Sequence, residues 1–241
     1  MNKNIIILIV AFIVVSIFIF LGNPHFAILF CIFSGAFEFN YLNIKRYANL
    51  IAEPIESASG YQMRIKHLKM IAEKASTLGF KENSVYRENT LLIPDIVCQF
   101  KHEIEPHFLT AIHHGLNITL SFCTYFEPKS SLTTCSNPVE GNWPLLPGEH
   151  IRILKTENLE NLWAEHKKGV DFLKQYSFKE KDLTLEEFIW QHLTDFTDSA
   201  KNVISMKYWL IKATWWELRE KGTIYCKSIQ QQVQSGMIKL E

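Results

Sequence analysis

The sequence has no excess of charge of either sign, because its 25 basic residues balance its 25 acidic residues. A protein that binds nucleic acid normally carries a basic excess for its phosphate contacts. We therefore expect no nucleic-acid partner. The sequence also has no internal repeat and no low-complexity tract, which excludes a repeat architecture.

Paired cysteine spacing is absent as well. The chain has five cysteines, at positions 31, 98, 123, 135 and 226, and no two of them form a CxxC pair. An odd number without such spacing is not typical of a disulfide framework or of a zinc site. The cysteines are therefore expected to be reduced thiols in a cytoplasm.

No motif for a cofactor or a metal ion is present. The sequence lacks a glycine-rich phosphate loop, a GxSxG elbow and an HExxH helix, so we expect no cofactor. The residues that could ligate zinc lack a close pair that would supply two ligands from one turn. His113 and His114 would also point to opposite faces of a strand. No metal site is therefore expected among these residues: Cys98, His102, His107, His113, His114 and Cys123.

What the sequence does have is a long apolar segment, since residues 5–37 contain no Asp, Glu, Lys or Arg. This run exceeds a buried core helix and predicts a transmembrane helical hairpin over residues 1–43, broken at "GNPH". Lys3 and Lys45 would flank a charge-free loop, which places both ends in the cytoplasm. The alternative is a single span followed by an interfacial helix. The interpretation implies contact with membrane lipids through residues 5–37 and a location at the bacterial inner membrane.

The rest of the chain predicts a juxtamembrane linker over residues 44–60 and a soluble α+β domain over residues 61–241. Apolar residues at helical spacing, ending at Gly79, predict a helix over 61–78. The alternation in "LNITLSFCTYF" predicts a half-buried strand over 116–126. Its expected antiparallel neighbours are "HFLTAIHHG" and "SLTTCS". The predicted fold class is therefore α+β, with a small antiparallel sheet packed with helices behind the hairpin.

Later elements are predicted from helix-capping signals. Thr156 precedes one helix, and Thr184 with Glu187 forms a capping box for the next. Thr214 with Glu217 forms another capping box. "MKYWLIKA" fits a strand or a helix, and "TIYCKSI" is expected to be the last strand.

The candidate site is the segment that contains a cysteine and a histidine around a Pro/Gly-rich connector. Cys135 is a candidate nucleophile, and His166 or His150 could act as its base. The catalytic candidates are therefore Cys135 and His166. Thr133, Thr134, Asn137, Trp143 and His150 are weak binding candidates. His166 also lies on the apolar stripe of a predicted helix, where a histidine is more often a core residue. His192 shows the same pattern, and the connector with Trp143 is expected to pack down as cover.

A family resemblance rests on three stretches. These are "SFCTYFEPKSSLTTCSNPVEGNWP", the helix "LENLWAEHKKGVDFL" and the late "KATWWELREKG". They resemble a pattern in uncharacterised bacterial membrane-anchored proteins, although "EPKS" replaces the usual glycine-containing turn. The resemblance implies a cytoplasmic α+β domain of unknown function and assigns no catalytic residue.

Three functional hypotheses follow. The leading one is a membrane-anchored cytoplasmic interaction or sensing module with a possible protein partner, because no reactive constellation has the required geometry. The second is a membrane-anchored enzyme that uses Cys135, or the segment of Thr133, Thr134 and Asn137, together with His166. The third is a structural scaffold in a membrane complex. The sequence favours a protein that is not an enzyme.

Overall fold

The computed structural model describes residues 35, 41–42, 44–45, 47–55, 61–88, 95–137, 148–215, 225–238 and 240. Within this part of the chain the strands form one sheet and the helices lie against it. The strands are β1 (Ala52–Pro54), β2 (Phe80–Glu88), β3 (Asp95–His102), β4 (His107–His114), β5 (Asn117–Glu127), β6 (Ser130–Cys135), β7 (Glu149–Ile153) and β8 (Lys179–Glu180). The helices are α3 (Gln62–Thr77), α4 (Leu159–Lys174), α5 (Leu185–Ser205), α6 (Trp209–Trp215) and α8 (Ile229–Gln234).

The sheet is mixed and follows the chain for most of its width. Its order is β1-β2-β3-β4-β5-β6-β7, and β8 pairs with β5 outside this path. Every neighbouring pair is antiparallel except β6 with β7, which run parallel. Parallel neighbours cannot be joined by a tight hairpin, so β7 is not part of the meander.

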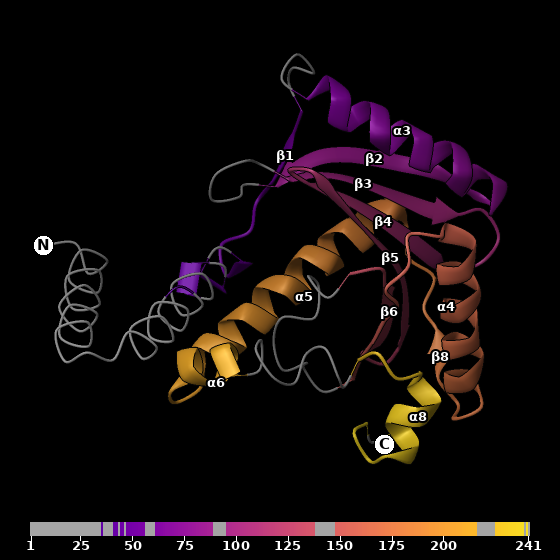
Figure 1. The fold of residues 1–241 in the computed structure, drawn as a ribbon. Coiled ribbons are helices and arrows are strands. Elements are labelled where there is room, and N and C mark those ends of the chain that lie inside the picture. The colour runs from indigo at the N-terminus through magenta and orange to yellow at the C-terminus, as the bar shows by residue number, and fades with distance from the viewer. Residues whose placement is uncertain are drawn as a thin grey trace, which may run out of the picture.

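Helices cover both faces of the sheet (Figure 1). On one face, α3 and α4 bury Leu68 and Trp163 against strand residues such as Phe80 and Phe122. On the other face, α5 places Phe188 against Phe108, with the two rings stacked at 4.0 Å. Helix α8 lies beside α4 and β7, and α6 follows α5. The sheet is therefore the middle layer between two layers of helices.

Both faces of β5 are consequently buried, although its sequence alternates like that of a half-buried strand. The burial pattern is continuous from Thr119 to Phe126, and it includes Ser121 and Thr124. Polar side chains that are hidden in this way need hydrogen-bond partners within the protein. The polar side chains under α4 and α5 are therefore the candidates for a functional site.

The prediction of a transmembrane hairpin is corrected here. Among the helices that the structure describes, none has the length and apolar character needed to cross a bilayer. The hairpin predicted over residues 1–43 therefore has no spanning helix among the described residues. The membrane-anchored module depended on that hairpin and is not supported either. Nearly all of residues 5–37 lie outside the described residues. Lipid contact and an inner-membrane location stay predictions.

The predicted sheet is also corrected, because it is neither small nor purely antiparallel. Within the described residues it has eight strands, and one pair of neighbours is parallel. Part of the predicted linker belongs to it, since Ala52–Pro54 pairs with β2 as β1. Ile44 and Tyr47, in the same predicted linker, pack against Ala200 and Val203 of α5. Apolar residues in that stretch thus join the core by long-range contacts that a local pattern does not reveal.

The predictions of individual elements have mixed outcomes. The helix ending at Gly79 is confirmed as α3, and Gly79 has a φ of +92°. The capping box of Thr184 and Glu187 is confirmed at the start of α5. "MKYWLIKA" contains the start of helix α6, whereas the predicted last strand is wrong in its described part, where a turn precedes α8. Glu217 of the third capping box lies outside the described residues.

Candidate ligand-binding cleft

A cleft lies between helix α5 and the strands β5, β6 and β7. It consists of two adjacent cavities, an inner one of about 60 Å³ and an outer one of about 250 Å³. Four residues line both cavities: Tyr125, Ser131, Glu149 and Asp195. The inner cavity is completed by Cys123, Thr133, Ile151, His192, Phe196 and Ser199.

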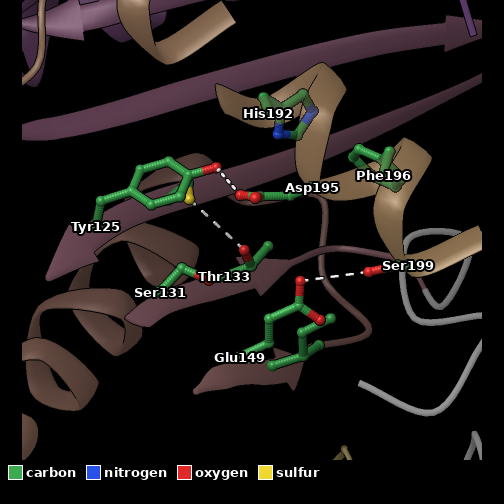
Figure 2. A pocket seen from close by; sticks show the side chains of 10 residues that line it. Tyr125, Ser131, Thr133, Glu149, His192, Asp195, Phe196 and Ser199 are labelled. Atoms are coloured by element: carbon green, nitrogen blue, oxygen red, sulfur yellow. Dashed lines mark hydrogen bonds between the residues drawn. The ribbon is translucent and has the colours of Figure 1, made fainter. Parts of the chain in front are cut away.

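The secondary structure explains why these side chains converge. Alternate residues of a strand share one face, so Tyr125 and Cys123 of β5 point the same way, as do Ser131 and Thr133 of β6. On α5 the spacing from His192 to Asp195, Phe196 and Ser199 is i, i+3, i+4 and i+7, which is one face of a helix. This stripe of α5 faces the strands across the inner cavity (Figure 2).

A tyrosine and a carboxylate meet at the junction of the two cavities. The Tyr125 O–H donates a hydrogen bond of 2.7 Å to Asp195 Oδ2, and the Gln191 side chain donates one of 2.8 Å to Asp195 Oδ1. Burial raises the pKa of Asp195 above its ordinary value, although these two hydrogen bonds oppose the shift. Burial also raises the pKa of Tyr125 well above 10, so the phenol stays protonated.

The second carboxylate of the cleft is Glu149, at the start of β7. The Ser199 hydroxyl donates a hydrogen bond of 3.4 Å to Glu149 Oε1, which connects α5 to the strand. On the strand side, the Thr133 hydroxyl contacts Cys123 Sγ at 3.7 Å. The hydroxyl protons of Ser199 and Thr133 are thus directed to partners within the wall of the cavity (Figure 2).

His192 is the least satisfied polar side chain of the inner cavity. Its ring stacks on Phe188 at 5.5 Å and meets Phe196 edge to face at 4.7 Å. The side chain is 8% exposed, and burial lowers its pKa to about 4. The ring is therefore neutral at pH 7. Among the described residues it has ring contacts but no hydrogen-bond partner.

The outer cavity has a mixed electrostatic character. Lys129 and Lys181 line it together with Asp198, and Lys129 and Asp198 are exposed. The turn at Gly148 forms part of its wall, where the Gly148 carbonyl accepts hydrogen bonds from the Ser130 hydroxyl at 2.7 Å and from the Ser131 amide at 3.0 Å. The outer cavity therefore offers both cationic and anionic groups near solvent, unlike the carboxylate-lined inner cavity.

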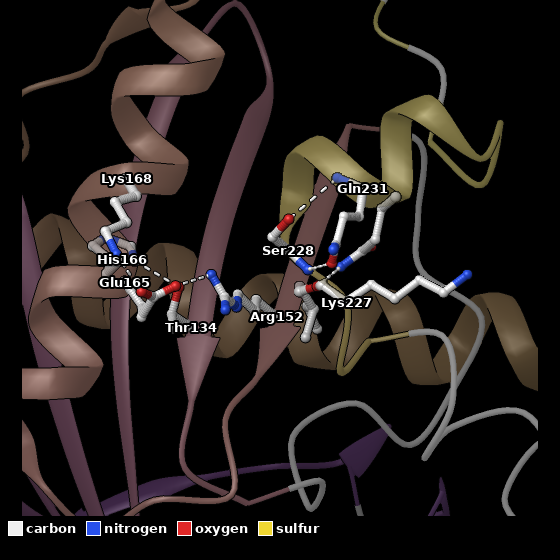
Figure 3. Close-up of polar contacts among 10 residues, drawn as sticks. Thr134, Arg152, Glu165, His166, Lys168, Lys227, Ser228 and Gln231 are labelled. Carbon is white, nitrogen blue, oxygen red and sulfur yellow. Dashed lines mark hydrogen bonds and ion pairs between the residues drawn. The ribbon is translucent and has the colours of Figure 1, made fainter.

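Of the residues predicted from sequence, Thr133 lies in this cleft, but Cys135 and His166 are not brought together. Adjacent strand residues face opposite ways, and Thr134 contacts His166 Nδ1 at 3.0 Å on the α4 face (Figure 3). His166 Nε2 contacts the Thr124 hydroxyl at 2.9 Å, so the ring bridges two strands. Cys135 lies on the other face, where it packs with Ile151. The thiol lies 3.7 Å from the Arg152 carbonyl oxygen, and His166 contacts Thr124 and Thr134 rather than Cys135.

The remaining predicted residues lie elsewhere. His150 is buried on β7 against the ring of Phe178, and burial lowers its pKa to about 4. Asn137 follows β6 and is partly exposed, and Trp143 lies outside the described residues. The binding role of each of these residues stays a prediction.

The histidines that were considered as metal ligands are divided between two faces. His113 contacts His67 of α3, with 3.2 Å between Nε2 and Nδ1, whereas His114 Nδ1 lies 3.0 Å from Asp95 Oδ2. His107 contacts the Thr124 hydroxyl at 2.6 Å instead. Within the described part of the chain, no group of three or more His, Cys, Asp or Glu residues is arranged to hold a metal ion.

Sequence reasoning did not find Tyr125, Glu149, Asp195 and Ser199 as site residues. One local signal existed, because α5 places Asp195 and Ser199 on the same face as the apolar Phe188 and Phe196. Polar residues within an inward-facing stripe indicate either a buried hydrogen-bond network or a cavity. The partners on the strands carry no comparable signal, since Tyr125 is 70 residues before Asp195.

Comparison with known proteins does not extend this description. No family model, no curated protein and no solved structure matches the chain at a significant level. The resemblance inferred from the sequence thus receives no support from these comparisons. The class of the protein that its fold defines is a three-layer α+β domain with a polar cleft under α5.

Proposed function

We propose that this protein binds a small polar molecule in the cleft between α5 and the strands β5, β6 and β7. The observation that carries the proposal is the convergence of three kinds of buried or half-buried polar group on one cavity. These groups are the Tyr125–Asp195 pair, the Glu149 carboxylate and the His192 ring. Ligand sites are typically concave and mostly apolar, with a few polar groups at defined positions.

The size of the cleft supports a small molecule. A single water needs roughly 10 to 15 Å³ of such space, so an outer cavity of about 250 Å³ accommodates many water-sized groups. The walls combine polar residues with apolar surface from Phe126, Ile151 and Phe196. A ligand could therefore bury apolar area while its polar atoms meet the carboxylates.

Binding is supported better than nucleophilic catalysis. His192 makes no hydrogen bond to any described serine, threonine or cysteine, so the described cleft contains no nucleophile activated by a histidine. The Thr133 hydroxyl contacts Cys123 Sγ, which is not a general base. The polar groups are arranged to hold a molecule rather than to attack it.

The test is a screen of small polar fragments against the full chain by ligand-observed NMR. Ser131 lines both cavities, so Ser131→Phe would fill the junction between them. Thr194→Phe is the matched control, because Thr194 is exposed on α5 and does not line the cleft. We expect fragments that bind the parent protein and Thr194→Phe but not Ser131→Phe.

Circular dichroism should first show that both variants are folded. A smaller filling variant, Ser131→Val, serves if Ser131→Phe does not fold. Fragments that bind Ser131→Phe and the parent protein equally would place the binding site elsewhere and reject the proposal. The absence of any bound fragment would reject it as well.

A further inference from the structure

We propose that the inner cavity recognises a primary ammonium group of the ligand. This inference rests on the proposed function and specifies the chemistry of the ligand's buried end. The ammonium nitrogen would lie among the Glu149 carboxylate, the Asp195 carboxylate and the His192 ring, while the rest of the molecule would occupy the outer cavity. Figure 2 shows these three side chains around the same space.

The first argument is that acceptors outnumber the donors still available in the described lining, which are the Ser131 hydroxyl and one N–H of the neutral His192 ring. Glu149 and Asp195 are carboxylates and can only accept when ionised. The Tyr125 proton is already donated to Asp195, and the Ser199 proton is donated to Glu149. A group that supplies several N–H donors and no acceptor complements such a lining, and a primary ammonium supplies three.

The second argument is the state of His192. The side chain is more than nine-tenths buried, lines the inner cavity and makes no hydrogen bond to the described residues. The nitrogens of this ring are not fully enclosed by protein, so a ligand that enters the cavity and donates to the ring would add a hydrogen bond that the described residues do not supply. Because burial lowers its pKa to about 4, the neutral ring offers an acceptor nitrogen at pH 7. A neutral ring also does not repel a cation.

The third argument is size. A cavity of about 60 Å³ holds only a few water-sized groups. An ammonium with one or two methylene groups fits this space, and Ile151 and Phe196 provide apolar surface for the methylenes. A trimethylated ammonium is bulkier and has no N–H donor, so it would fill the cavity without satisfying its acceptors.

The fourth argument is the sign of the charged groups in the inner cavity. Its lining residues include two carboxylates and no lysine or arginine, whereas the outer cavity shares both carboxylates and adds Asp198, Lys129 and Lys181. A cation is therefore favoured in the inner cavity, where opposite charges interact through a medium of lower dielectric constant than water. The outer cavity has charged groups of both signs, so it does not fix the charge of the rest of the ligand.

The experiment is a titration of the full chain, with ring-labelled histidine, against n-propylammonium chloride at pH 7.5 and constant ionic strength. The neutral probe 1-propanol and the cation tetramethylammonium, which has no N–H, are titrated in parallel. His192→Phe identifies the His192 ring resonances by their loss and keeps an aromatic ring between Phe188 and Phe196. We expect propylammonium to shift these resonances and to bind about tenfold or more tightly than either other probe.

Two substitutions test the assigned acceptors. Glu149→Gln removes a negative charge and keeps the shape of the side chain, so it should weaken propylammonium binding by about tenfold or more. His192→Phe should weaken binding in the same direction. Glu186→Gln is the matched control, because Glu186 is exposed on α5 and lines neither cavity. It should leave binding unchanged. If His192→Phe does not fold, Glu149→Gln alone decides.

The outcomes separate this inference from the proposed function. If propylammonium and propanol bind equally and Ser131→Phe abolishes both, the ammonium inference is wrong while the cleft still binds small molecules. If fragments bind in the cleft but propylammonium does not, the inference is likewise overturned. If propylammonium binding is equally strong in Glu149→Gln and in the parent protein, the assigned location is wrong.

Discussion

The Tyr125 hydroxyl donates a hydrogen bond of 2.7 Å to Asp195 Oδ2, and this bond joins strand β5 to helix α5 across the cleft. Tyr125 is buried and Asp195 is half-buried, so water competes weakly for either group. The bond thus holds α5 in position over the strands while one edge of the Asp195 carboxylate still faces the cavity. The same pair contributes to the stability of the domain and to the shape of the candidate site.

Replacing this tyrosine with phenylalanine tests that dual role. Tyr125→Phe should lower the free energy of unfolding by about 1 to 3 kcal/mol, because the Asp195 carboxylate loses a donor in a partly buried place. It should also raise the pKa of Asp195 further, since the lost hydrogen bond favours the ionised form. Urea unfolding measures the first effect, and carboxyl-detected NMR measures the second.

The control is Tyr176→Phe, at an exposed tyrosine, which should change the free energy of unfolding by less than about 0.5 kcal/mol. Equal losses in the two variants would contradict the prediction.

His166 is the central residue of the α4 face, where its two ring nitrogens contact the hydroxyls of Thr124 and Thr134. His166→Ala should destabilise the protein by about 1 to 3 kcal/mol, because it leaves a cavity and two hydroxyls without their partner. Urea denaturation at pH 7.5 gives the value. Lys168→Ala, at an exposed neighbour on the same helix, should cost less than about 1 kcal/mol. A stable His166→Ala protein would show that the ring does not bridge the strands.

Acid should destabilise the fold through five buried histidines. Burial lowers the pKa of His107 to about 3, those of His150 and His192 to about 4, and that of His166 well below 6.5, and it also lowers the pKa of His113. Below pH 6.5 the unfolded chain binds protons at these positions and the folded chain does not, so stability is fully present above pH 6.5 and falls with decreasing pH. Each residue contributes about 1.4 kcal/mol per pH unit between its two pKa values. Asp195 acts in the opposite direction, because its pKa is raised in the folded state. Urea unfolding at pH 7.5, 6 and 5 measures the slope, and a flat profile would refute the prediction.

His150 provides a separate test of this mechanism. Neither of its ring nitrogens has a hydrogen-bond partner among the described residues, and the side chain is buried beside Phe178. His150→Leu should therefore leave stability unchanged or increased at pH 7.5. At pH 5 the variant should be more stable than the parent protein by about 2 kcal/mol, because one proton is no longer taken up on unfolding. The comparison of urea midpoints at the two pH values decides this. A gain that does not depend on pH would mean that packing, rather than titration, controls the position.

The sequence-based predictions were accurate where the contacting residues are close in the chain and failed where they are far apart. The strand around Phe122 and the capping box of Thr184 with Glu187 were predicted correctly, because alternation and capping depend on residues close in the chain. The burial of the second face of β5 was not predicted, since it depends on α5. The inward face of α5 was recognised at His192, but nothing in the sequence indicated that Tyr125 would lie opposite.

The same limit applies to the pairing of Cys135 with His166. Cys135 and Thr134 are neighbours in the sequence, yet the alternation of β6 directs Thr134 to His166 of α4 and Cys135 to the opposite face, beside Ile151 and Tyr225. The parallel pairing of β6 with β7 then places Glu149 opposite Ser131, which supplies a carboxylate to the cleft. A pairing formed across an intervening connector has no local sequence pattern. The candidate site is for this reason a product of topology rather than of a motif.

Gly148 links the topology to the cleft, because it precedes β7 and lines the outer cavity. Its φ is +87°, and a Cβ atom there would lie 2.6 Å from the Lys129 carbonyl oxygen. Gly148→Ala should therefore destabilise the protein in two ways, through backbone strain at a positive φ and through a clash with main chain that cannot rotate away. We expect a loss of about 2 to 4 kcal/mol.

Gly236 supplies the matched control for this substitution. Its φ is +70°, but a Cβ atom there would meet nothing within 4 Å. Gly236→Ala should therefore show the backbone term alone, about 1 kcal/mol, in the same urea experiment. The difference between the two variants isolates the close approach of β7 to the Lys129 turn. If both variants lose the same stability, the close approach to the Lys129 turn does not constrain the rim of the cleft. In that case Gly148→Ala should bind the fragments of the screen as well as the parent protein does.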